Sequence, residues 1–348
     1  MDVRKVFTGA PARAIAFSLA ATALLTCALP AQAGRLDSPL EMMYAPDNTL
    51  VVGRLIEINP VGRIVLERKD VLGGKMRPPD KIDVRVPVEV LGTLKTGERY
   101  VIAYSTYHRD PRKPVGMVGN TGGAVVLAST GIDPALFSDT RQTRAILKAG
   151  RSEQGRESRR MLDLLLAALA GPDPQLQNLA AGEIALQSEI GEHLRDHDRS
   201  VLEKTVRDPK TPTRVRLTLL EASARRSQDL GAWWQPAALE IVTTTPVDGY
   251  PDKASDPVSL VLLALEVLDR YAVKVPPDAL KRWVWNTNPA LVERVCVMLR
   301  REAPEQERST IQLALADPKL PEPTRKFLND HLRRLDRLNE RTRKEGSG

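Results

Sequence analysis

An Asp or Asn followed by Pro recurs through the second half of the chain, each time between an apolar stretch and an amphipathic one. Asp and Asn side chains accept hydrogen bonds from the free N–H groups that begin a helix, and Pro at the first helical position gives up a donor that has no partner there. The pattern therefore predicts that each copy separates two helices. The copies stand at Asp173-Pro174, Asp208-Pro209, Asp256-Pro257, Asn288-Pro289 and Asp317-Pro318.

The spacing of these junctions is 35, 48, 32 and 29 residues, and the long interval contains an insertion with Pro and Gly at 245–255. Helix pairs that repeat at such a period stack into an α-helical solenoid. We therefore expect a solenoid over residues 151–343, followed by a disordered tail at 344–348. Its helices are expected near 161–171, 174–190, 198–207, 212–226, 232–243, 257–272, 277–286, 289–301, 304–316 and 321–341.

The residues around two of the junctions, 208–215 and 288–295, resemble the Asp-Pro-x-x-x-Val-Arg signature of HEAT-type repeats. The likeness concerns the C-terminal half of the chain. It departs from the signature after the first junction, where Leu179 stands in the Arg position, and after the last, where Arg325 comes two residues late. The resemblance implies a right-handed stack of helix pairs with a groove that commonly binds other proteins.

The region before the helices, residues 34–130, has the pattern of a β-rich domain. Short runs of β-branched residues alternate with turn residues, which favours a small barrel or sandwich. The segment 70–80 is rich in Gly and Pro and is expected to be a surface loop. Strands are expected near 50–58, 62–68, 82–88, 100–104 and 123–128.

The order of these strands resembles small secreted OB-like domains. A strand carrying Val52-Gly53 is followed by a long hairpin, by Leu94-Lys95-Thr96-Gly97 and then by a Tyr-rich strand. A connecting helix is expected over 131–150, opened by Asp133-Pro134. The expected fold class is thus multidomain α and β: an N-terminal OB-like β-barrel followed by a C-terminal HEAT-like α-solenoid.

The first 33 residues have the features of a secretory signal peptide. Arg4 and Lys5 precede the apolar run 14–29, and Ala31-Gln32-Ala33 is a small-x-small cleavage site. These features predict a periplasmic or secreted protein. Leu24 to Cys27 also resembles a bacterial lipobox, so the alternative is a lipoprotein anchored through Cys27, the one route by which we expect a membrane association.

Charge and cysteine content narrow the classes of partner. The formal net charge is +7 at pH 7, and both signs are mixed along the expected helices. A dedicated nucleic-acid binder shows a concentrated basic stripe, so this distribution argues against a nucleic-acid partner. Beyond the leader only Cys296 remains, in an apolar run where a free Cys packs as a small hydrophobic residue.

The histidines give little support for an enzyme. His193 and His197 have the i, i+4 spacing of a metal pair, but the residue after the first is Leu194, where the zinc-protease motif requires Glu. His108 lies near Asp110 and a glycine-rich loop, which leaves an envelope hydrolase as the alternative function. No metal and no cofactor are expected.

The leading hypothesis is a non-enzymatic adaptor or scaffold that holds another protein or an envelope component. Aromatic side chains dominate interface hot spots, so Trp234, Tyr250 and Trp285 are candidate partner-binding residues. A further alternative is polysaccharide or nucleic-acid binding on the barrel, with a candidate ligand face of Tyr104, Tyr107 and Arg109.

Overall fold

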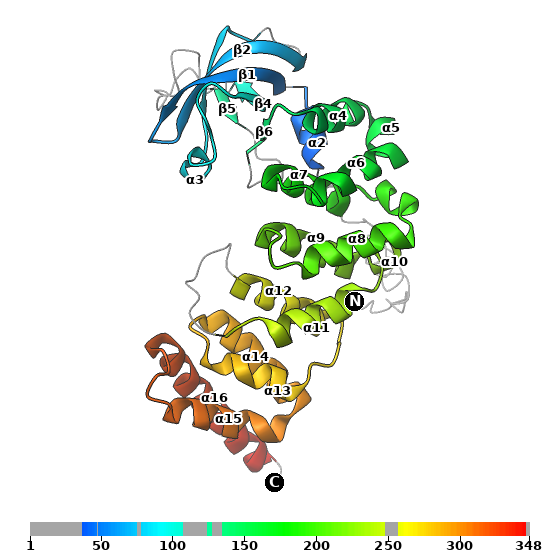
Figure 1. Ribbon diagram of the computed structural model, residues 1–348. Helices are drawn as coiled ribbons and strands as arrows, with labels where there is room; N and C mark the ends of the chain where they lie inside the picture. Colours follow the sequence, from blue (N-terminus) through cyan, green and yellow to red (C-terminus); the bar gives the residue numbers. More distant parts are fainter. Residues whose placement is uncertain are drawn as a thin grey trace, which may run out of the picture. The chain divides into compact units, whose positions relative to one another are not determined.

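The computed structural model describes residues 37–46, 48–74, 78–106, 124–126, 134–247 and 257–345. Within them the chain is a mixed α and β protein, with a sheet in its N-terminal part and helices in its C-terminal part (Figure 1). The expected leader and Cys27 lie outside these ranges.

The sheet has six strands in the order β1-β2-β3-β5-β4-β6, and β1 also pairs with β4. The β3–β5 pair is parallel and the other pairs are antiparallel. Pairing therefore runs from β1 through β2, β3, β5 and β4 back to β1. The strands are β1 (Asn48–Asn59), β2 (Arg63–Gly73), β3 (Lys81–Arg85), β4 (Arg99–Thr106), β5 (Ala124–Val126) and β6 (Leu136–Ser138).

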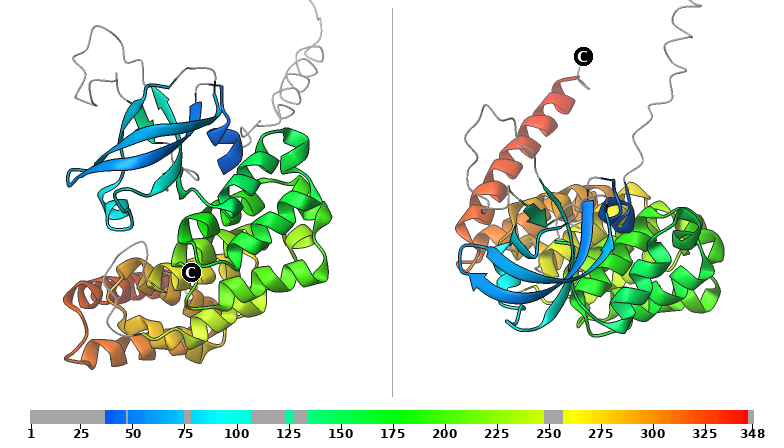
Figure 2. Two further views of the ribbon diagram at one scale, coloured as in Figure 1. Left: turned by 45° about the horizontal axis from the view of Figure 1, so that its top comes forward. Right: turned by 90° about the horizontal axis from the view of Figure 1, so that it is seen from above.

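Strands β1 and β2 form an antiparallel hairpin, whose turn lies between the two strands expected near 50–58 and 62–68 (Figure 2). The Asn59 side chain accepts the Val61 N–H at 3.1 Å, and Gly62 has a φ of +82°, which a glycine adopts without strain. The expected loop at 70–80 is wrong in its first residues, because β2 continues to Gly73, which pairs with Leu50. Long-range pairing with β1 overrides the local turn composition there.

The strands β1, β4 and β6 bury both faces. Val51, Ile102 and Leu136 belong to one apolar cluster inside the sheet, whereas their neighbours Val52 and Phe137 belong to a second cluster that they share with the helices. Strands β2 and β3 contribute Ile64, Leu66, Ile82 and Val84 to the first cluster. Side chains alternate between the two faces of a strand, so helices must cover the outer face of β1, β4 and β6.

The prediction of a connecting helix over 131–150 is wrong in its first half. Residues 136–138 form β6, which pairs with β4 in the register Val101↔Phe137. Helix α4 (Arg141–Gly150) begins only after Thr140, whose side chain accepts the Thr143 N–H at 3.1 Å. Burial of Phe137 against the helices favours the extended conformation over the helix that Asp133-Pro134 suggested.

Short helices flank the sheet at α2 (Pro39–Met43) and α3 (Val88–Leu91). The C-terminal part consists of helices close to the expected ranges. They are α5 (Glu153–Arg156), α6 (Arg159–Leu169), α7 (Pro174–Leu186), η1 (Glu189–His193), α8 (Asp196–Arg207), α9 (Thr213–Arg225), α10 (Ser227–Leu230), α11 (Trp234–Thr244), α12 (Pro257–Arg270), α13 (Pro277–Lys281), η2 (Arg282–Trp285), α14 (Pro289–Glu302), α15 (Pro304–Ala316) and α16 (Glu322–Glu345).

These helices contact one another in two series (Figure 1). In one series α6 contacts α8, α8 contacts α11, α11 contacts α13, and η2 contacts α15. In the other, α7 contacts α9, α9 contacts α12, α12 contacts α14, and α14 contacts α16. Helices α6 and α7, α8 and α9, α11 and α12, and α15 and α16 also contact each other, so each helix packs both within its pair and against the next pair.

The Asp/Asn-Pro junctions have two different local structures. Asp173 and Asn288 are N-caps that accept two backbone N–H groups each, and Pro174 and Pro289 occupy the first helical turn. Asp208 and Asp317 instead follow the end of a helix, and each accepts the N–H of the Lys two residues on, at 2.9 Å. At these two junctions the next helix begins later, at Thr213 and Glu322. The junction at Asp256 lies outside the described residues.

Candidate functional site

Two adjoining hollows follow the junctions α6–α7 and α8–α9, and we call them together the junction groove. The larger, of about 480 Å³, lies between the two junctions, and the smaller, of about 260 Å³, lies between the start of α7 and the sheet. Pro174 lines both. Other lining residues include Leu169, Pro172, Val201, Lys204, Lys210 and Pro212 in the larger hollow, and Leu94, Tyr100 and Leu136 in the smaller.

The walls of the junction groove are held by side chains that cap helix ends. The amide of Gln177 donates to the carbonyls of Leu169 and Gly171 at 3.1 and 2.9 Å, which closes the end of α6. Arg216 donates to Val206 O at 2.6 Å and closes the end of α8. The last carbonyls of a helix have no partner within it, so these bonds fix the junctions as rigid turns.

The edge of the larger hollow carries two available positive charges. Lys204 and Lys210 are exposed, and neither forms an ion pair with a residue in the described ranges. The carboxylate of Asp208 is turned toward the backbone, where it accepts the Lys210 N–H. The groove thus combines proline and aliphatic walls with two ammonium groups, an arrangement that suits an extended peptide with acidic side chains.

The tryptophans are mostly part of the core. Trp234 is 2 % exposed and packs on Tyr271 with ring centroids 5.2 Å apart, so it is not accessible to a partner, contrary to its candidate role. Trp283 is fully buried and donates to Val242 O at 2.9 Å. Trp285 is half-buried and keeps an accessible part. Tyr250 lies outside the described residues.

The prediction of a ligand face on the expected barrel is wrong at Tyr104. This side chain is buried inside the sheet with Tyr100 and Ile102, so it does not offer a stacking surface to a ligand. Tyr107 and Arg109 lie outside the described residues, as do His108 and Asp110, the candidate hydrolase pair.

The histidine pair at 193 and 197 does not share a helix. His193 ends η1, and α8 begins at Asp196, which separates the two side chains by a bend. Within the described part of the chain, no group of three or more His, Cys, Asp and Glu side chains is placed to hold a metal ion.

A buried polar cluster near the C-terminus was not anticipated from the sequence. His331 lies 2.8 Å from Glu307, and Arg300 donates to Glu307 at 3.0 and 3.1 Å. Burial acts to raise the pKa of Glu307, but the hydrogen bonds from His331 and Arg300 outweigh it and lower that pKa. The nearby Cys296 is buried, which raises the pKa of its thiol to about 12 and confirms its place in the core. The cluster joins α14, α15 and α16, and its residues line neither the junction groove nor the hollows on α16 and beside α4.

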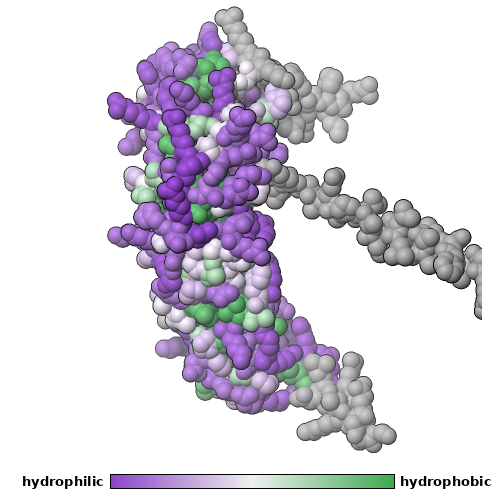
Figure 3. Space-filling view, turned by 90° about the vertical axis from the view of Figure 1, so that its right-hand side faces the viewer, coloured by the Kyte–Doolittle hydropathy of each residue, from purple (hydrophilic) through white to green (hydrophobic). Residues whose placement is uncertain are grey.

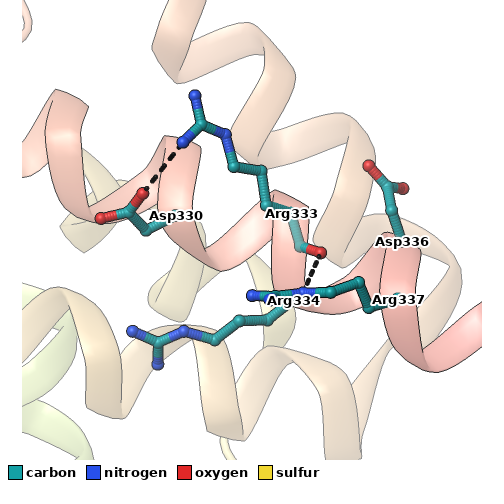
Figure 4. Close-up of a pocket in the computed structure, with 5 residues that line it drawn as sticks. All are labelled: Asp330, Arg333, Arg334, Asp336 and Arg337. Atoms are coloured by element: carbon teal, nitrogen blue, oxygen red, sulfur yellow. Dashed lines mark hydrogen bonds and ion pairs between the residues drawn. The ribbon is translucent and has the colours of Figure 1, made fainter.

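A further hollow of about 550 Å³ lies on the surface of α16 (Figure 4). Asp330, Arg333, Arg334, Asp336 and Arg337 line it, and Arg333 pairs with Asp330 at 3.6 Å. A single helix supplies all of these side chains, so among the described residues no second element encloses a ligand there.

Hydrophilic side chains predominate on the face drawn in Figure 3, and hydrophobic ones form small, separate groups there. None of the helices in the described ranges is long and apolar enough to cross a membrane. No known protein family, curated protein or solved structure matches this chain.

Proposed function

We propose that the chain is a non-enzymatic adaptor of the periplasm or the secreted fraction, which binds an extended, acidic segment of another protein in the junction groove. In this proposal the N-terminal part is an OB-like barrel and the C-terminal part a HEAT-like solenoid. The junction groove is the observation that carries the proposal, because it spans successive helix pairs and presents unpaired lysines beside apolar walls.

The barrel is supported by the pairing of the strands. The return of β4 to β1 leaves no free edge between those two strands, as closure into a barrel requires. The single parallel pair, β3 with β5, is compatible with the partly open Greek-key barrel of OB-like domains.

The solenoid is supported by the two series of helix contacts. In a repeat array each pair contacts mainly its neighbours, and terminal units present a polar outer face. The last helix, α16, matches that expectation. Leu328 and His331 are buried on one side of it, whereas Arg333, Arg334 and Arg337 are exposed on the other.

The proposal is tested by partner capture with the full chain from an envelope extract, with photo-crosslinking at the junction groove. The test variant is Lys204→Glu with Lys210→Glu. The matched control is Lys319→Glu, because Lys319 and Lys210 occupy the same position after an Asp-Pro junction. We expect a reproducible partner that binds wild type and the control but binds the double variant at least about tenfold more weakly. A partner retained equally by all three would overturn the proposed site.

A further inference from the structure

A separate hollow of about 380 Å³ lies where α2, β2 and α4 meet, and we call it the α4 trough. Tyr44, Leu72 and Leu147 supply its apolar surface. Arg144, Lys148 and Arg151 also line it, so the charged groups that line it among the described residues are all cations.

The apolar surface of the α4 trough is held in place by contacts between distant parts of the chain. The Tyr44 hydroxyl donates to Leu147 O at 2.7 Å, which ties the end of α2 to α4. Burial raises the pKa of Tyr44 to about 12, although Arg151 and Arg156 act in the opposite direction. The phenol therefore stays neutral and keeps donating at physiological pH. Leu147 is buried in the cluster that the sheet shares with the helices, and Leu72 and Tyr44 pack against that cluster.

The cations lie on one side of α4. Arg144, Lys148 and Arg151 are four and three residues apart, and side chains at these spacings share a helix face. Arg144 is engaged by Asp139 at 2.6 and 3.0 Å and lies 3.5 Å from Asp70. Lys148 and Arg151 are exposed, and no ion pair joins either of them to a residue in the described ranges.

Cations near the end of α4 also interact favourably with the helix dipole, and this interaction alone explains why positively charged residues occur there. It does not account for an apolar hollow between them. An apolar surface beside two uncompensated cations is complementary to a molecule with an acyl chain and an anionic head, because the chain leaves water while the head is paired.

We propose that the α4 trough binds one anionic amphiphile, an acyl chain that carries a carboxylate or phosphate head. The head lies between Lys148 and Arg151, where the planar guanidinium can pair with two of its oxygens. The chain lies over Leu72, Leu147 and the Tyr44 ring. This site shares no lining residue with the junction groove, so a test that contradicts one of the two proposals leaves the other unaffected.

The test is calorimetric titration of the full chain with hexanoate, octanoate, decanoate and dodecanoate, each below its micelle concentration. Each added methylene that becomes buried is expected to tighten binding about fourfold until the trough is full. Decanol and decyltrimethylammonium, which carry the same chain without the anion, are expected to bind about tenfold more weakly than the matching carboxylate.

Two variants locate the site. Lys148→Glu with Arg151→Glu is expected to weaken decanoate binding about tenfold or more, whereas Lys204→Glu with Lys210→Glu, which makes the same charge change in the junction groove, is expected to leave it unchanged. Leu72→Ser is expected to reduce the gain in affinity that each added methylene gives in the carboxylate series. Inorganic phosphate, the head-group probe, is expected to bind this variant as weakly as it binds the wild type. Equal binding of decanol and decanoate, binding of inorganic phosphate as tight as that of decanoate, or equal losses of decanoate affinity in both double variants would overturn the proposal.

Discussion

The sheet of residues 48–138 and the helices of residues 159–345 bury their apolar side chains in different ways. Strands β1, β4 and β6 bury both faces, one inside the sheet and one against the helices, whereas β2 and β3 contribute mainly to the inner cluster. The helices instead share one cluster that continues from Phe137 to Leu328. The comparison shows that three strands couple two cores, and that the helical part extends one of these cores along many helices.

The largest expected effects are losses of stability caused by one substitution in each of the two cores. Phe137→Ala removes a ring that the sheet places against the helices, and Ile64→Ala removes a side chain from the inner cluster. We expect a loss of about 3–5 kcal/mol for the first and about 2–5 kcal/mol for the second. Amide hydrogen exchange should accelerate in both the sheet and α7, which contacts β6, for Phe137→Ala, but only in the sheet for Ile64→Ala. The same exchange pattern in both variants would show that the cores are not distinct.

The next effect concerns the contact of helix α2 with α7. Glu183 on α7 is buried and accepts the Leu40 N–H, and Gln187 donates to Ser38 Oγ at 3.0 Å. Burial raises the pKa of Glu183 from 4.5 to about 7, against the hydrogen bonds from Leu40 and Ser38. Glu41 and Arg156, which form an ion pair at 3.6 Å, are the nearby charges that also act on it.

Because the folded protein holds this proton more tightly than the unfolded chain, stability falls as pH rises from about 4.5 to about 7 and is not lost further above that range. The decrease is about 3 kcal/mol for a shift of this size. Glu183→Gln keeps an oxygen for Leu40 and should remove the decrease, which denaturant melts at pH 5 and pH 8 would measure. An unchanged pH profile in the variant would assign the titration to another group.

The smallest effect concerns how the helical part closes its helix ends. Arg226 donates to the carbonyls of Ile184, Ala185, Gln187 and Ser188 at 2.8–3.4 Å, which closes the end of α7 from the following helix pair. We expect Arg226→Ala to cost about 2 kcal/mol, because these carbonyls lose a charged donor. The exposed neighbour Arg225 is the matched control, and Arg225→Ala should change stability by less than about 0.5 kcal/mol. Equal losses would mean that the guanidinium does not act as a cap.

The helices were easier to predict from the sequence than the sheet, because their boundaries depend on neighbouring residues. Asn288 caps α14 through the N–H groups of Ala290 and Leu291, and that signal is local. Asp208 did not begin a helix, since Pro212 provides a later start and α9 begins after it. Strand β6 was missed because its partner β4 lies more than thirty residues earlier, where no local pattern reports the pairing.

The candidate site depends on tertiary structure even more strongly. The junction groove brings together residues near 171 and near 210, and only the packing of α6 against α8 makes them neighbours. The alternation in β4 placed Tyr100 and Tyr104 on one face, as the sequence indicates, but could not reveal that this face is the buried one. Helical spacing does not tell which of two adjacent tryptophans is buried, so the sequence left Trp234 as a candidate for binding a partner. In the structure both Trp233 and Trp234 are buried.

The central claim is that the helices after residue 150 form a stacked array of pairs. Pulsed electron paramagnetic resonance tests it most directly, by measuring the distances between spin labels on three exposed positions. These are Asp163 on α6, Gln235 on α11 and Ser309 on α15. The buried thiol of Cys296 should not compete for the label. Two packing steps separate each consecutive pair of sites, or about 20 Å per interval, so the account predicts a distance from 163 to 309 close to the sum of the other two. A distance from 163 to 309 no longer than that from 163 to 235 would contradict the array.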